Sequence, residues 1–107
     1  MAWLTLVAAG LLEVAFAASL KPSAGFTRLV PSLAVIVFGT AAVVTLTRTL
    51  DRIPVGTAYA AFTAIGAIGT VLVGIVRYDE PVTLARLASI ALVLAGVIGL
   101  RLTGGAA

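Results

Sequence analysis

Four long apolar runs limit the folds open to this chain more than any other feature of its sequence. Each run is close to the ~20 residues that an α-helix needs to cross about 30 Å of hydrocarbon. A span surrounded by lipid must be helical because its backbone groups have no other partners, and a membrane β-barrel needs alternating apolar and polar positions. The sequence therefore predicts an all-α membrane protein with transmembrane helices at approximately Ala2–Leu20, Leu29–Leu46, Val55–Val76 and Val82–Leu102.

Composition agrees with a lipid environment. Of the 107 residues, 62% are hydrophobic and 10% are charged, whereas a soluble domain averages about 45–50% apolar and about 25% charged residues. The chain has no cysteine and no histidine. Disulfides and thiolate metal sites are therefore excluded, and the usual near-neutral proton carrier is missing. We expect no metal site, no cofactor and no enzymatic activity.

The segments between the runs are short and charged. They cover Lys21–Arg28, Arg48–Pro54 and Arg77–Pro81. None is long enough for a domain, so residues 1–107 are predicted to form a single four-helix unit with both termini on the same side. Proline at 54 and 81 suits the start of the following helix, and the aromatic rings of Trp3 and Tyr78 suit a membrane interface.

The basic residues are single and scattered, which fits anchoring in lipid headgroups and not binding to nucleic acid. They fall almost evenly on the two sides of the predicted bundle. The positive-inside rule therefore leans only slightly towards external termini, and insertion in both directions remains open. One side carries Lys21, Arg28, Arg77 and Arg86, and the other carries Arg48, Arg52 and Arg101.

The first run is also compared with a secretory signal peptide. Ala15-Phe16-Ala17 resembles a small-residue cleavage site. A basic segment before the run is absent, and Glu13 would lie inside the apolar region. We therefore expect the first run to remain as a membrane span.

Glu13 is the only acidic residue near the middle of a predicted span. An ionised acid at that depth costs roughly 2.5–3.5 kcal/mol, so intramembrane acids usually face the protein interior or mark a transport pathway. No Lys or Arg lies near the centre of any span. A protonated Glu13 with a purely structural role is the alternative. We interpret Glu13 as a site that carries a proton or a cation.

Removal of a carboxylate from water disfavours its charged form, whereas a bound cation favours that form. A proton and a cationic ligand would therefore compete for Glu13. If the site opens to each side of the membrane in turn, this competition produces antiport.

A stripe of residues in the third run has the three- and four-residue spacing of one helical face. It offers hydroxyl groups for a carboxylate and aromatic rings for a cation, although such stripes also serve packing. Its members are Tyr59, Phe62, Thr63 and Gly66.

Small residues recur in the last two runs, where they permit close helix packing in lipid. In the third run, Gly66 and Gly69 leave room for a helix bend. Four helices are too few to enclose a pathway comfortably, so we expect a dimer. The small residues of the fourth run that are predicted to pack in the dimer are Ala91, Ala95, Gly96 and Gly99.

From end to end, the sequence resembles the small multidrug resistance transporters, and within them the guanidinium-exporter branch. The matching segments are Ala9–Val14 (AGLLEV), Gly25–Ser32 (GFTRLVPS), Pro54–Ala60 (PVGTAYA), Glu80–Pro81 and Gly96–Leu100 (GVIGL).

The resemblance implies an antiparallel dimer in the bacterial inner membrane that works by alternating access and uses the proton gradient. It implies that Glu13 of each subunit binds either protons or a cationic substrate, and that Tyr59 lines the site. The glycines of the third span would form a hinge, and the fourth span would form the dimer contact.

The sequence departs from the guanidinium-exporter branch at four positions. That branch has tryptophan at 16 and 62 and serine at 42, whereas this chain has Phe16, Phe62 and Ala42. Ala64 replaces the first glycine of the usual bend. Phe62–Thr63 and Gly69–Leu72 (GTVL) look like one member of a paired, heteromeric subtype.

These features favour a proton-coupled exporter of small or hydrophobic organic cations, such as quaternary ammonium or guanidinium compounds, that pairs with a homologous subunit. The alternatives are a homodimeric guanidinium exporter, a non-transporting subunit that stabilises a homologous chain, and a passive pore.

Overall fold

The computed structural model describes residues 2–103, which form four helices joined by short connections. All four are long and apolar enough to cross a membrane, so the predicted all-helical architecture is confirmed. Their bounds are α1 (Ala2–Leu20), α2 (Leu29–Thr47), α3 (Val55–Tyr78) and α4 (Leu84–Thr103).

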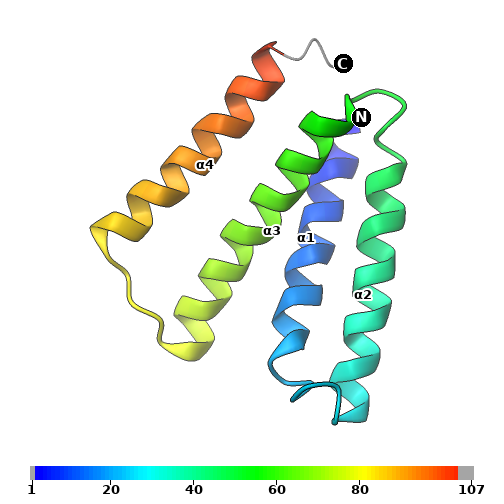
Figure 1. Ribbon diagram of the computed structural model, residues 1–107, viewed down its shortest axis with the longest axis vertical. Coiled ribbons are helices and arrows are strands. Elements are labelled where there is room, and N and C mark those ends of the chain that lie inside the picture. The colour runs from blue at the N-terminus through cyan, green and yellow to red at the C-terminus, as the bar shows by residue number, and fades with distance from the viewer. Residues whose placement is uncertain (1, 104–107) are drawn as a thin grey trace.

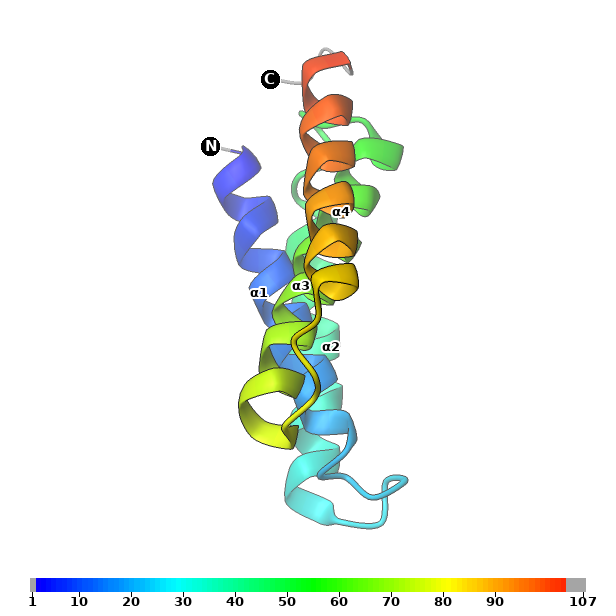
Figure 2. The same cartoon turned by 90° about the vertical axis from the view of Figure 1, so that its left-hand side faces the viewer.

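The helices run up and down, so that the start of α1 and the end of α4 lie at the same end of the molecule (Figure 1). Helix α1 packs closely on both α2 and α3, whereas the backbone of α4 comes close only to that of α3. Figure 2 shows the same arrangement from the side. Helix α4 lies towards the end of the bundle where α1 begins, and the α1–α2 connection lies at the opposite end. The molecule is therefore a packed three-helix unit with a fourth helix beside it.

The third and fourth helices differ by two residues from their predicted limits, and the local chemistry explains both shifts. Helix α3 continues to Tyr78, where Asp79 takes a left-handed conformation (φ 51°) and donates its N–H to the Gly74 carbonyl. Helix α4 begins at Leu84, after Pro81, because the Thr83 hydroxyl accepts the Arg86 N–H at 3.1 Å. A threonine hydroxyl that accepts an N–H of the first turn is a favoured helix start.

The buried apolar cluster lies in the half of the bundle nearer the termini. It draws on the first half of α1, the second half of α2, the connection between α2 and α3, and the first half of α3. Its members are Leu6, Ala9, Ala42, Leu46, Ile53, Ala58, Ala61 and Phe62.

Glycines allow α1 and α3 to approach closely. A Cβ atom at Gly10 would lie 2.5 Å from the Ile65 Cγ2 atom and 2.6 Å from the Ile65 Cβ atom. A Cβ atom at Gly66 would lie 2.6 Å from the Glu13 Cγ atom, and one at Gly69 would overlap the side chain of Val14. The two helices therefore touch over residues 10–14 of α1 and 65–69 of α3 because these positions lack side chains.

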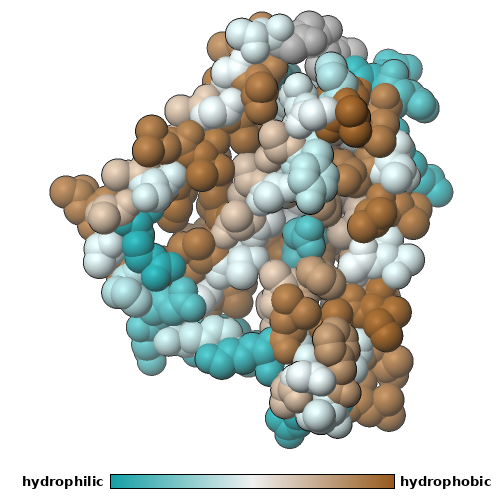
Figure 3. All heavy atoms as spheres, viewed as in Figure 1, coloured by the Kyte–Doolittle hydropathy of each residue, from teal (hydrophilic) through white to brown (hydrophobic). Residues whose placement is uncertain are grey.

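No residue of α4 is buried in the single chain. Brown, hydrophobic spheres cover much of α4 in Figure 3, and gaps separate it from α3. Cation–π contacts tie the helix ends together, because Arg101 lies 5.0 Å from the Trp3 ring and Lys21 lies 4.2 Å from the Tyr78 ring.

We predict that Gly10→Ala destabilises the chain by about 1–3 kcal/mol, the usual cost of overpacking a tight contact. The β-carbon of Ile65 is fixed to its backbone, so α1 and α3 would have to separate. The measurement is unfolding in detergent micelles, followed by the helical circular-dichroism signal. Gly56→Ala is the matched control, since no atom lies within 4 Å of its added Cβ; equal losses of stability for both variants would contradict the close-approach explanation.

Candidate functional site

A cavity of about 660 Å³ lies between α1, α2 and α3 around the middle of the bundle. Helix α1 contributes Glu13 and Phe16, and α3 contributes Tyr59 and Phe62. The face supplied by α2 consists of Gly39, Thr40, Val43, Val44 and Leu46.

Glu13 reaches this cavity because α1 packs on a glycine of α3. Its side chain lies against Gly66, where any larger residue would meet the Glu13 Cγ atom. Glu13 is half-buried. Among residues 2–103 it makes no ion pair and no hydrogen bond, and the ion pair found there joins Arg86 to Glu80. The carboxylate is therefore available to a ligand.

Aromatic rings form two walls of the cavity. Phe16 fits against Gly39 of α2, where a Cβ atom would lie 2.9 Å from the Phe16 Cδ1 atom. The rings of Tyr59 and Phe62 lie 6.2 Å apart in a tilted arrangement. Phe62 is buried and Tyr59 is 60% exposed, so Phe62 forms the inner part of this wall and Tyr59 forms its exposed part.

Thr63 is left out of this cavity. It lines a second cavity of about 720 Å³ between α3 and α4, together with Tyr59, Ala64 and Gly96. One residue along a helix turns the side chain by about 100°, so Phe62 and Thr63 face different neighbours. The predicted stripe of α3 is thus divided, with Phe62 and Gly66 towards α1, Thr63 towards α4, and Tyr59 between the two cavities.

The sequence analysis did not single out Thr40, which the structure places in the wall of the Glu13 cavity. Several other threonines donate their hydroxyl to a helix carbonyl, as Thr45 and Thr47 do at 2.7 Å. Within residues 2–103, the Thr40 hydroxyl has no such partner. A threonine in the middle of an apolar run is the signal that could have identified it. Ala42, by contrast, belongs to the buried cluster and does not line the cavity.

The predicted hinge and dimer residues have these positions. Gly66 and Gly69 lie within one continuous helix against α1, and the Thr70 hydroxyl donates to the Gly66 carbonyl at 2.6 Å. Hydrogen bonds of this type often bend helices. The small residues of α4 lie at the surface of the single chain, where nothing comes within 4 Å of a Cβ atom added at Gly96 or Gly99. Their roles in bending and dimer packing stay predictions.

The chemistry of the cavity suits a small organic cation. It offers a carboxylate, the hydroxyls of Thr40 and Tyr59 and several ring faces, and no basic residue lines it. A carboxylate forms its strongest hydrogen bonds with charged donors, and aromatic faces attract cations. The described residues contain no cluster of acidic side chains that could hold a metal ion.

Comparisons with known proteins agree with this arrangement. The profile of the family described as Small Multidrug Resistance protein matches residues 1–93. A guanidinium exporter of Yersinia pestis is 52% identical over 102 residues, which cover 95% of this chain and 98% of the relative. The guanidinium exporters of Salmonella typhimurium and Escherichia coli K12 are each 46% identical over 103 residues, or 96% of this chain and 98% of the relative. The chain is therefore a multi-pass membrane transporter that belongs to the small multidrug resistance family, and it is not an enzyme.

Proposed function

We propose that this chain is a homodimeric, proton-coupled exporter of guanidinium in the bacterial inner membrane. Glu13 of each subunit would bind a proton or the cation, but not both at once. The observation that carries the proposal is the unpaired carboxylate of Glu13 in a cavity of about 660 Å³ lined by Phe16, Tyr59 and Phe62.

The shape and charge of guanidinium fit this site. The ion is planar and presents N–H groups in a fork that matches the two oxygens of a carboxylate. Glu13 would accept two of these N–H groups, and the Thr40 hydroxyl could accept another. Tyr59 would contribute its ring face to the bound cation.

Competition at Glu13 provides the coupling. A charged carboxylate with no partner is costly at this depth in the membrane, so the empty, ionised site is disfavoured. The site would change the side to which it opens only with a proton or guanidinium bound to Glu13. A proton gradient would then drive the cation in the opposite direction.

The relatives support a homodimer over the heteromeric pair that the sequence alone favoured. Proteins 46–52% identical to this chain over nearly their whole length are named guanidinium exporters. The absence of tryptophan indole N–H groups at positions 16 and 62 is the feature that favours a heteromeric pair. Thr40 compensates for part of this absence, because its hydroxyl could supply a polar partner in the same cavity.

A purely structural subunit remains a second candidate. Residues such as Ala64 allow it, since they depart from the pattern expected at the helix bend. An intact cavity with Glu13 and Tyr59 argues against it, because a stabilising partner would not need an unpaired carboxylate in its interior.

We predict that the purified wild-type chain, reconstituted alone in liposomes, accumulates guanidinium when the interior is acidic. Outward movement of protons would drive the cation inwards. Glu13→Gln should reduce this uptake to the level of protein-free liposomes, because the amide keeps the shape of the side chain but cannot ionise.

Three results would change the assignment. Uptake that appears only with a homologous second chain would favour the heteromer. Paired uptake that survives Glu13→Gln in this chain would favour the structural subunit. Flux that ignores the pH gradient and never saturates would indicate a passive pore.

We predict that Thr40→Val weakens guanidinium binding about tenfold, the effect expected from losing one hydrogen bond to a charged group. Valine keeps the shape of threonine, so the cavity should remain intact. Thr47→Val is the matched control on the same helix, since the Thr47 hydroxyl is already bonded to the Val44 carbonyl. Isothermal titration of detergent-purified dimers with guanidinium checks the difference, and equal affinities for the two variants would remove Thr40 from the site.

A further inference from the structure

A groove of about 300 Å³ lies between α3 and α4, near the connection that joins them and apart from the Glu13 cavity. We propose that this groove binds an anionic phospholipid, with the lipid phosphate on Arg86 and part of one acyl chain along the groove. The site would therefore be occupied when the leaflet around the α3–α4 connection contains anionic headgroups.

The groove has an apolar wall and one charged residue. The wall includes Ala67, Ile68 and Val71 of α3 and Ile90 and Val93 of α4. Arg86 supplies the charge. The other polar side chain, Ser89, donates its hydroxyl to the Ala85 carbonyl at 2.8 Å. Apart from Arg86, the groove therefore presents mainly apolar atoms, which suit a hydrocarbon chain.

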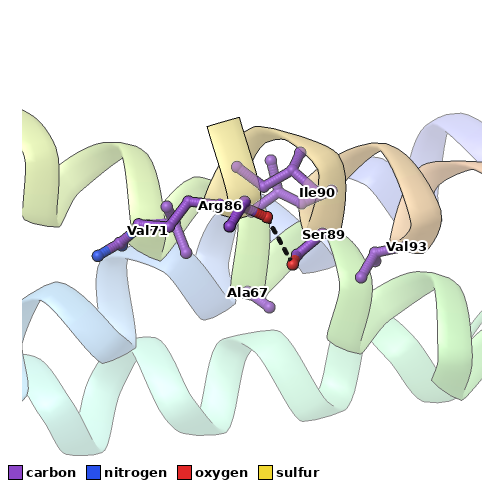
Figure 4. A pocket seen from close by; sticks show the side chains of 8 residues that line it. Ala67, Val71, Arg86, Ser89, Ile90 and Val93 are labelled. Atoms are coloured by element: carbon purple, nitrogen blue, oxygen red, sulfur yellow. Dashed lines mark hydrogen bonds between the residues drawn. The ribbon is translucent and has the colours of Figure 1, made fainter. Parts of the chain in front are cut away.

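Arg86 lies at the correct end of the groove for a headgroup. It is the third residue of α4, whereas Val93 lies seven residues further on, which corresponds to about 10 Å along a helix. Figure 4 shows the Arg86 side chain extended towards Val71, with its nitrogen end away from Val93. The charge is therefore near the membrane interface and the apolar part of the groove runs deeper.

The connection between α3 and α4 holds Arg86 in place. Glu80 pairs with the Arg86 Nη2 atom at 3.1 Å. The Glu80 carboxylate in turn lies against the buried Gly74, where a side chain would overlap it. A guanidinium group has five N–H donors, and this pair occupies one of its two terminal nitrogens. Donors remain for a phosphate, although the charge of Glu80 opposes its binding.

A second copy of this chain fits the groove less well than a lipid does. Helical geometry turns Ala91 and Ala95 about 140° and 180° around α4 from Arg86, whereas Gly96 lies about 80° from Arg86. A dimer that packs on Ala91 and Ala95 leaves the Arg86 end of the groove open. The groove also contains a cation at interface depth, which complements the phosphate of an anionic lipid and has no counterpart in an apolar helix contact.

The test measures lipid retained by the dimer and does not depend on transport. Protein is extracted from vesicles of phosphatidylcholine and phosphatidylglycerol in equal parts, and native mass spectrometry counts the lipids that stay bound. The wild type should retain phosphatidylglycerol in preference to phosphatidylcholine. Arg86→Gln should lower that preference about fivefold, the contribution of one interfacial arginine to anionic-lipid attraction.

Matched variants separate the contribution of the Arg86 charge from that of the Arg86–Glu80 ion pair and of the groove itself. Arg52→Gln removes an exposed arginine from the other side of the bundle and should leave the preference unchanged. Glu80→Gln breaks the same ion pair as Arg86→Gln but frees the guanidinium, so it should maintain or raise the preference. Ala67→Leu fills the groove from an exposed position of α3 and should reduce retention of both lipids.

Three outcomes would overturn the proposal. The first is an unchanged lipid preference in Arg86→Gln. The second is a loss of dimers in the mass spectrum of Ala67→Leu with lipid retention intact, which would assign the groove to a second copy. The third is displacement of the lipid by soluble glycerophosphate, which would show that Arg86 binds phosphate without using the groove.

Discussion

The close approach of α1 to α3 is the contact on which the rest of the molecule depends. Three positions without side chains, Gly10, Gly66 and Gly69, allow it. Because Gly66 receives the Glu13 side chain, the same contact brings the carboxylate to a cavity shared with α2 and α3. Fold and site are therefore not separable here, since a substitution that moves α1 from α3 also moves the only acidic group in the interior of the described bundle.

The bundle is unevenly packed. The buried cluster lies towards the termini, and α4 has no buried residue. Two cavities and a groove border α3, and Tyr59 lines both cavities. A helix bordered by open space on two sides can shift with less disruption than one in a filled core. Freedom of this kind is what the proposed exposure of Glu13 to each side of the membrane in turn requires.

The sequence predicted the helices well because the length and hydropathy of a membrane span are strong signals. It predicted their ends less well, because the Thr83 cap is a local hydrogen bond that periodicity does not reveal. Glu13, Phe16, Tyr59 and Phe62 reach one cavity, whereas Thr63 does not and Thr40 does. Which of two adjacent residues faces a cavity depends on the rotation of each helix in the bundle, and this rotation follows from packing at positions such as Gly39 and Gly66.

The central claim is that Glu13 holds either a proton or a cation. Proton release on binding tests it most directly. Guanidinium is added to detergent-purified dimers in weakly buffered solutions over a series of starting pH values, and the change in pH is recorded. The account predicts that protons are released as guanidinium binds, that the release saturates with the binding sites, and that Glu13→Gln abolishes it. Binding of guanidinium at full occupancy without any release of protons would contradict the account.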